Sequence, residues 1–579
     1  MISSTMHAFF TSSCSTSDLS CFLLARVSSL VPLIYTGRFT ARSKQWPMDA
    51  AASGTSPVMQ FHGIVDEPTS SSSLLHAVLE RSQRHCYGQE TPGEFPLAVS
   101  PSIVLHVLSA CKLDPKDLAA LEATCTFFSK PAKFAPDFAL SLPELAAFDM
   151  CQKRSMFKLM TQQEREHLKQ RCGGSWKLVL RYILVREMNC SQVVAGPGHS
   201  IVVTTKGDVH SFGANCWGQL GLGDTEDRFK PCLIRSLQGI KITQAAVGSR
   251  QTMLVSDTGS VYAFGTGSFV GAGFSDTADH ITTPKIVESL KGVFVVQAAI
   301  GCYFSAFLSR EGQVYTTSWG RADRLGHSSD PSDAEPRLLS GPLEDVLVAQ
   351  ISAGNCYLLM LAYQPTGMTV YSVGCGLGGK LGHGCKSNKG TPKLIEHFRA
   401  LSFNPVSVAA GTWHAAALGD DGRVCTWGWG YTGCLGHGDE ECKALPTVVQ
   451  GLSNVKAVNI STGEYTTFVV SDNGDVYSFG SAESLNLGFQ EDEEADGADF
   501  STPNIVESLK ALNDKAVQIS RTNSSYWLNS EMGYPHTLAL MESGRLYAFG
   551  GGIKGQLGVK LSEGQERVQN PERVPIDIC

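Results

Sequence analysis

The sequence predicts an all-β fold, a seven-bladed β-propeller over residues 189–579, preceded by a small α-helical domain. Two observations support this prediction. A dipeptide of an aromatic residue or valine followed by glycine recurs along the chain, with its glycine at positions 213, 265, 320, 374, 428, 480 and 550. An earlier glycine, a turn glycine and a later proline keep step with this dipeptide in each copy. The chain therefore repeats a unit of about 53 residues.

Each unit is expected to form four short strands. Runs such as residues 476–479 alternate apolar and polar side chains, which is typical of strands, and the turn glycines supply the positive φ that hairpins need. A lone four-stranded sheet cannot bury both faces, whereas radial stacking buries each face on a neighbour. We assign the aromatic residue before each repeated glycine to this packing; these residues are Phe212, Phe264, Trp319, Trp427, Phe479 and Phe549.

Closure of the ring is expected to involve the end of the chain. Each later unit is interpreted as beginning with a strand just after its proline, for example at residues 285–287. The first unit lacks such a strand before Val193, whereas residues 571–576 form an unmatched one at the C-terminus. The sequence therefore predicts that the C-terminal strand completes the first blade.

The region before the repeats divides into two parts. Residues 1–94 are rich in serine and small residues and are expected to be disordered or to serve in targeting. Residues 1–47 contain four basic residues and one acidic residue, as a plastid or mitochondrial transit peptide does, although translation from Met48 is an open alternative. Residues 95–188 carry helical periodicity, notably at 162–171 and 176–186, with Asp114-Pro115 starting a further helix.

Composition narrows the classes of function and the compartment. The net charge of −8 argues against a protein that binds nucleic acid through a dense positive field. The 18 cysteines show no C-x-x-C pair, which favours reduced thiols in an intracellular protein, in the nucleus or cytoplasm unless the transit peptide is genuine. The apolar runs are too short to span a bilayer. We therefore expect no direct contact with nucleic acid or membrane.

The repeat resembles that of the regulator of chromosome condensation family, in a form like that of its plant members. The family pattern Ala-x-Gly-x-x-His is matched closely by Ala-Gly-x-x-His at residues 195–199 and 410–414, and Gly-Gln-Leu-Gly follows at residues 218–221. The resemblance implies a seven-bladed propeller. It leaves function open, because the family includes a GTPase exchange factor, chromatin binders, a UV-B photoreceptor, a β-lactamase inhibitor and ubiquitin-ligase subunits.

Photoreception is not expected, because the slot that holds tryptophan in the photoreceptor differs here. That slot is occupied by Pro197, Ser249, Cys302, Asn355, Thr412, Glu464 and Tyr534.

Residues 101–128 resemble an F-box, the helical hook that inserts apolar side chains into the Skp adaptor of cullin-type ubiquitin ligases. The usual Leu-Pro is Ser100-Pro101 here, and the spacing shifts by one before Leu113. A purely structural helical cap is the alternative. The residues that the resemblance assigns to adaptor binding are Pro101, Val104, Leu105, Val107, Leu108, Leu118, Leu121 and Phe128.

Two patterns that imitate ligand sites are explained by the repeat. Residues 374–380 fit a phosphate-loop pattern, but Leu381 stands where Ser or Thr would bind Mg²⁺, and each glycine is in register with the other units. The Leu-Gly-His triplets ending at His327, His383 and His437 recur for the same reason. We expect no cofactor, no metal and no catalytic set, and hence not an enzyme.

Two irregular loops are candidate contacts for a protein partner. The seventh unit is interrupted by a loop with two aromatic residues, and the sixth carries an acidic insertion; the candidate residues are Tyr526, Trp527, Glu491, Asp492, Glu493 and Glu494. Two functions remain open: a substrate receptor of a ubiquitin ligase that binds a Skp adaptor, or an exchange factor for a small GTPase. In either case we expect a monomer.

Overall fold

The computed structural model describes two compact units. Its described residues are 105, 108–109, 113–124, 140–189, 192–266, 280–302, 304–318, 335–339, 341–364, 367–481, 487–488, 499–521 and 534–578. The first unit comprises residues up to 154 together with 175–181, and the second comprises residues 155–174 and 182–579. The expected boundary between residues 188 and 189 therefore does not separate these units, because helical segments before residue 189 belong with the propeller.

The first unit is helical. Helix α4 (Pro115–Thr124) begins with proline at its first position, as predicted, and helix α6 (Leu142–Gln152) is capped by Ser141. Glu122 of α4 accepts a hydrogen bond from the Ser141 hydroxyl at 2.5 Å and forms an ion pair with Lys177. Lys177 also lies 3.2 Å from Glu144, so it joins the two helices to the first turn of helix α9 (Trp176–Met188).

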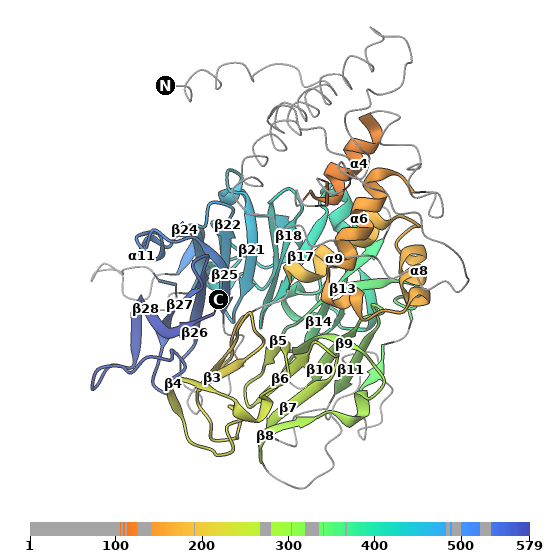
Figure 1. The fold of residues 1–579 in the computed structure, drawn as a ribbon. Helices are drawn as coiled ribbons and strands as arrows, with labels where there is room; N and C mark the ends of the chain where they lie inside the picture. Colours follow the sequence, from red (N-terminus) through yellow and green to blue (C-terminus); the bar gives the residue numbers. More distant parts are fainter. Residues whose placement is uncertain are drawn as a thin grey trace, which may run out of the picture. The chain divides into compact units, whose positions relative to one another are not determined.

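Seven four-stranded antiparallel sheets form the propeller, as predicted (Figure 1). Blade 1 contains β1 (Val193–Ala195), β2 (His199–Val203), β3 (Val209–Gly213) and β4 (Arg228–Leu233). Blade 2 contains β5 (Ile242–Val247), β6 (Gln251–Ser256), β7 (Val261–Thr266) and β8 (His280–Ile286). Blade 3 contains β9 (Val295–Ile300), β10 (Phe304–Ser309), β11 (Val314–Ser318) and β12 (Arg337–Leu338). Blade 4 contains β13 (Leu347–Ala353), β14 (Tyr357–Gln364), β15 (Gly367–Gly374) and β16 (Lys389–Leu394). Blade 5 contains β17 (Pro405–Ala410), β18 (His414–Gly419), β19 (Val424–Gly428) and β20 (Lys443–Val448). Blade 6 contains β21 (Ala457–Thr462), β22 (Thr466–Ser471), β23 (Val476–Gly480) and β24 (Phe500–Ile505). Blade 7 contains β25 (Ala516–Arg521), β26 (His536–Met541), β27 (Arg545–Gly551) and β28 (Arg567–Asp577).

Every blade uses four strands that are consecutive in the chain. The first strands of neighbouring blades contact one another around a closed ring in which β25 touches β1, so they form the inner wall of the propeller. The fourth strands lie at the free outer edge of each sheet. Short helical turns, such as α10 (His397–Ala400) and α11 (Glu507–Lys510), lead from an outer strand to the next inner strand.

The prediction that the C-terminal strand completes the first blade is wrong. Strand β28 pairs with β27 and is the fourth strand of blade 7, whereas blade 1 is complete with β1 to β4. The sequence pattern predicts a boundary before a first strand at the repeated proline, but the proline lies within the outer strand of six blades, as Pro284 does in β8, and directly before it in blade 3. Proline belongs there because it lacks an N–H group and so prevents another strand from pairing with the free edge.

Side-chain packing, rather than strand exchange, joins blade 7 to blade 1. Val574 and Ile578 are buried in a cluster with Val193 and Phe212, and the backbone N–H of Thr205 donates to the Ile578 carbonyl at 3.0 Å. Figure 1 shows the blade that ends in β28 beside the blade that ends in β4. The C-terminus therefore still fastens the ring.

The assignment of the repeated aromatic residues to inter-blade packing is confirmed. Phe212, Phe264, Trp427, Phe479 and Phe549 are fully buried, each against the preceding blade in the ring, whereas Trp319 lies outside the described residues.

The glycine after each of these aromatic residues is also required. Gly213 has φ of 113°, and a Cβ there would lie 2.5 Å from the carbonyl oxygen of Gly198 on the neighbouring strand.

Glutamine side chains form hydrogen bonds with the unpaired backbone groups of the inner strands. An inner strand has one unpaired edge, and Gln350 of β13 accepts from the N–H of Val408 at 2.9 Å and donates to its carbonyl at 3.0 Å in the next blade. Gln297 does the same one blade earlier, and Gln244 does so two blades earlier. Blade 5 has Ser407 at this position, and its hydroxyl donates to Asn189 at 2.6 Å instead.

Candidate interaction surface

The two faces of the propeller differ in what covers them. On the face that bears the turns between second and third strands, helix α8 (Gln162–Arg171) and the second half of α9 pack onto blades 3 to 5. Arg186 donates to the carbonyls of Ser309 and Arg310 at 3.2 and 2.9 Å, and Tyr182 donates to that of Val348 at 3.1 Å. The opposite face carries the loops between first and second strands, such as residues 411–413, and the long loops between third and fourth strands, such as residues 429–442.

An aromatic patch lies on the loop-bearing face of blades 4 and 5. We define it by Leu377, Trp413, Trp429 and Tyr431. The ring centroids of Trp413 and Trp429 are 5.4 Å apart, and those of Trp429 and Tyr431 are 5.2 Å apart. Leu377 is 49% exposed and Tyr431 is 54% exposed. Gly378 lies against the Trp429 ring, which brings the loop of blade 4 onto that of blade 5.

A buried lysine supports this patch from below. Lys380 is 1% exposed, and its ammonium lies 5.2 Å from the ring centres of both Tyr357 and Trp413. Tyr357 donates from its hydroxyl to the His414 carbonyl at 2.7 Å. Cation–π contacts of this kind help to fix Trp413 at the base of the patch.

Carboxylates border the patch on its outer side. The loop that contains Tyr431 continues into Asp439, Glu440 and Glu441, and the backbone of Gly430 lies directly against that of Glu441. Burial acts to raise the pKa of Asp439, but hydrogen bonds from Lys443 and from the Glu441 N–H outweigh it, and the pKa is lowered. Asp439 is therefore ionised at neutral pH.

A second aromatic group lies on the same face at blades 1 and 2. The guanidinium of Arg250 stacks 4.4 Å above the ring of Trp217, and the His280 ring is 5.1 Å from that tryptophan. The exposed residues Cys216, Leu377, Tyr431 and Ile553 occupy the same position of this loop in four different blades. The loop-bearing face thus repeatedly exposes an apolar or sulfur-bearing side chain.

Histidines of the repeat motif link neighbouring blades rather than reach the surface. His199 bonds Thr252 at 2.7 Å, His414 bonds Thr467 at 2.7 Å, and His536 bonds Ser200 at 2.6 Å, each pair spanning two blades. All three are fully buried. Burial lowers the pKa of His199 and His536 to about 3 and that of His414 to about 4. These histidines are neutral structural links.

Leu-Gly-His triplets and the pattern at residues 374–380 also have structural roles. His383 bonds the Ser372 hydroxyl at 2.9 Å and His437 bonds that of Thr426 at 3.0 Å, which fastens each loop to its third strand. Gly378 and Gly379 pack against blade 5. Within the described ranges, histidines, cysteines and carboxylates do not gather in the groups of three that hold a metal ion.

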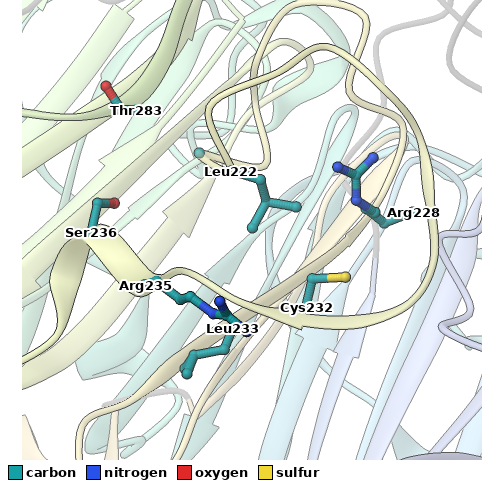
Figure 2. Close-up of a pocket in the computed structure, with 8 residues that line it drawn as sticks. Leu222, Arg228, Cys232, Leu233, Arg235, Ser236 and Thr283 are labelled. Atoms are coloured by element: carbon teal, nitrogen blue, oxygen red, sulfur yellow. The ribbon is translucent and has the colours of Figure 1, made fainter.

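A pocket of about 440 Å³ opens at the rim between blades 1 and 2. Figure 2 shows Leu222 at its centre, with Arg228 and Cys232 on one side and Ser236 and Thr283 on the other. Arg228 already pairs with Asp224 at 2.5 Å. This pocket therefore lacks a free charged group at that wall and is a weaker candidate than the aromatic patch.

Four of the eight residues assigned to adaptor binding are described, and they lie mostly inside their unit. Leu108, Leu118 and Leu121 are buried at 6%, 0% and 7% exposure, and Leu105 is partly buried. Pro101, Val104, Val107 and Phe128 lie outside the described residues. Helix α4 instead exposes Ala119 and Ala123.

The proposed client contacts also lie outside the described residues. These are Tyr526, Trp527, Glu491, Asp492, Glu493 and Glu494. Sequence reasoning missed the aromatic patch, because its members come from two repeats. The available signal was three aromatic residues, Trp413, Trp429 and Tyr431, at positions where the other units have mostly smaller or polar residues.

Comparison with known proteins identifies the repeat. Residues 181–524, more than half of the chain, match the RCC1-like domain family. The E3 ubiquitin-protein ligase HERC2 of Homo sapiens is 31% identical over 346 residues, which cover 59% of this chain but 7% of HERC2. The ultraviolet-B receptor UVR8 of Arabidopsis thaliana is 27% identical over 333 residues, 57% of this chain and 73% of the receptor.

A solved structure agrees with this fold. Prp20p of Saccharomyces cerevisiae, characterised for its binding to Gsp1p and histones, superposes with a TM-score of 0.55 at 21% identity, covering 68% of this chain and 89% of Prp20p. In the part of the chain that is described, the helices are all too short or too polar to cross a bilayer.

Proposed function

The chain belongs to the RCC1-like domain family, whose propeller is a protein-interaction domain, and from this premise we propose that it is the substrate receptor of a ubiquitin ligase. In this proposal the loop-bearing face binds a client protein, and the N-terminal helical unit binds an adaptor. The protein then recruits and does not itself catalyse. The relation to HERC2 supports a ligase setting, although the match covers a small part of that relative.

One observation carries the proposal. The aromatic patch exposes Leu377 and Tyr431 at 49% and 54%, where burial in the core would be the ordinary arrangement for such residues. Tryptophan and tyrosine dominate the binding energy of protein interfaces, because they bury large areas at a small cost in conformational entropy. A patch of this composition is suited to a protein partner.

The adaptor half of the proposal needs a test at exposed positions. Leu118 is fully buried, so a charged substitution there would unfold the unit and lose adaptor binding for an unrelated reason. Ala119 and Ala123 are exposed on α4, one turn apart. The double variant Ala119→Arg/Ala123→Arg should abolish co-purification of the full chain with a recombinant Skp adaptor, while its circular dichroism is unchanged.

Gln163→Arg, which adds an arginine on the exposed face of α8, is the control and should bind as the unchanged chain does. Failure of the unchanged chain to bind the adaptor, or binding that survives the double substitution, would refute the adaptor role.

A second candidate is an exchange factor for a small GTPase. The acidic loop at Asp439, Glu440 and Glu441 favours it, because a negative loop beside a rigid face suits a basic surface on a nucleotide-binding protein. Prp20p, studied for its binding to Gsp1p, shares the fold. Release of labelled GDP from a panel of GTPases measures this activity directly, and an unchanged release rate across the panel would exclude it.

A further inference from the structure

Two kinds of group that attract cations meet at the aromatic patch. The faces of Trp429 and Tyr431 present π-electrons, and aromatic rings of this kind attract arginine and lysine side chains. The backbone carbonyl of Glu441 lies against Gly430, the residue that joins Trp429 to Tyr431 in the chain, and Glu440 is exposed next to it in the sequence. Cation–π attraction and charge attraction therefore act on the same site.

Two lysines also lie near the patch. Lys380 is 1% exposed, and its ammonium is held between the rings of Tyr357 and Trp413, beneath the exposed surface. Lys443 lies between Asp439 and Glu441, at 3.0 and 3.1 Å, and so offsets part of their charge. Glu440 has no cation within ion-pairing distance among the described residues.

The patch also exposes an apolar side chain beside the site for a cation. Leu377, from the loop of blade 4, is 49% exposed and adjoins Trp429 through Gly378. Contact between Leu377 and an apolar residue of the partner would remove the exposed surface of both from water. The geometry thus sets an apolar contact at blade 4 next to a cation site at blade 5.

We propose that the aromatic patch binds a segment of the client protein that carries an arginine next to an apolar residue. This inference rests on the proposed function, since it names the chemistry of the client that the loop-bearing face receives. Arginine fits better than lysine because its planar guanidinium stacks on tryptophan and tyrosine and also donates to carboxylates.

Selection from a displayed library of random ten-residue peptides tests the inference. The full chain should enrich peptides with arginine beside leucine, isoleucine, valine, methionine or phenylalanine. Tyr431→Ala should weaken the binding of a selected peptide about tenfold by fluorescence polarisation, because it removes an exposed aromatic contact. Glu440→Lys should weaken it about as much and flatten its dependence on salt.

Matched controls lie at the same loop of blade 7. Ile553→Ala removes an exposed apolar residue at the position equivalent to Tyr431, and Glu563→Lys reverses an exposed charge; neither should change the affinity. Enrichment of acidic or purely apolar peptides, or affinity that Tyr431→Ala leaves intact, overturns the inference. So does concentration-dependent dimerisation that Tyr431→Ala abolishes, because a second copy would then occupy the patch.

The outcomes also separate this inference from the proposed function. Adaptor binding is measured at Ala119 and Ala123 on helix α4, without a peptide. If the adaptor binds but arginine-bearing peptides are not selected, the client chemistry is wrong and the receptor role stands. If peptides are selected but no adaptor binds, the patch is an interaction site outside a cullin-type ligase.

Discussion

Replacement of Gln350 by alanine tests how the blades are held together at the inner wall. The Gln350 side chain is 7% exposed and makes two hydrogen bonds to one residue of the next blade, Val408, at 2.9 and 3.0 Å. Alanine would leave the N–H and the carbonyl of Val408 without those partners. Each buried group that loses its hydrogen bond costs about 1–3 kcal/mol, so the free energy of unfolding should fall by about 3 kcal/mol.

Urea denaturation followed by tryptophan fluorescence measures this loss. Gln238→Ala removes the same side chain at an exposed position and is the control, for which a change within about 0.5 kcal/mol is expected. Gln350→Ser should cost nearly as much as alanine. Serine is native at the equivalent position of blade 5, but there Asn189 complements Ser407. A midpoint for Gln350→Ala equal to that of the control would refute the role assigned to the glutamines.

Three further predictions concern pH, the helical segment and the C-terminus. The folded-state pKa values of His199, His414 and His536 are about 3, 4 and 3, below the unfolded value of about 6.5. The contribution of these neutral histidines to the free energy of unfolding is therefore fully present above pH 6.5 and is lost toward pH 4, by about 1.4 kcal/mol per pH unit for each histidine. His414→Gln should make the pH dependence of the urea midpoint less steep. Arg186→Met removes donors to two carbonyls of blade 3 and should lower the free energy of unfolding by about 2–4 kcal/mol; a midpoint equal to that of the unaltered chain would contradict this. Deletion of residues 567–579 removes the outer strand of blade 7 and the buried Val574, so the melting temperature should fall, and an unchanged melt would contradict the packing at this junction.

The repeat period was sufficient to predict the propeller. Short strands with an aromatic residue and glycine at a fixed position can bury their faces only on copies of themselves, so the number of units gave the number of blades. The limits of a blade were harder to predict. In the sequence, a proline inside an outer strand cannot be told from a proline before a new strand. In both places the missing N–H group interrupts hydrogen bonding on one side of the strand. Pro571 was misplaced for this reason.

The candidate surface depends on information that a linear pattern does not hold. Trp427 and Trp429 are two residues apart, yet Trp427 is fully buried between blades and Trp429 is partly exposed in the patch. Strand alternation ends at Gly428, and beyond it the direction of a side chain depends on the loop. The contact between Trp413 and Trp429 further requires that the hairpin of β18 and β19 bring their loops together.

The exception in blade 5 shows that the helical segment is part of the propeller. Other blades with a described contact reach the inner edge of the next blade through a glutamine or asparagine, such as Gln350 of blade 4 toward Val408 of blade 5. At Ser407 the side chain is too short to reach the next strand, and Asn189 donates to the Val406 carbonyl at 3.2 Å and accepts from the Ser407 hydroxyl. A residue that follows helix α9 thus occupies the inner wall. Because Tyr182 and Arg186 fix the same helix to blades 3 and 4, segment 182–189 stabilises the propeller on the face opposite the aromatic patch.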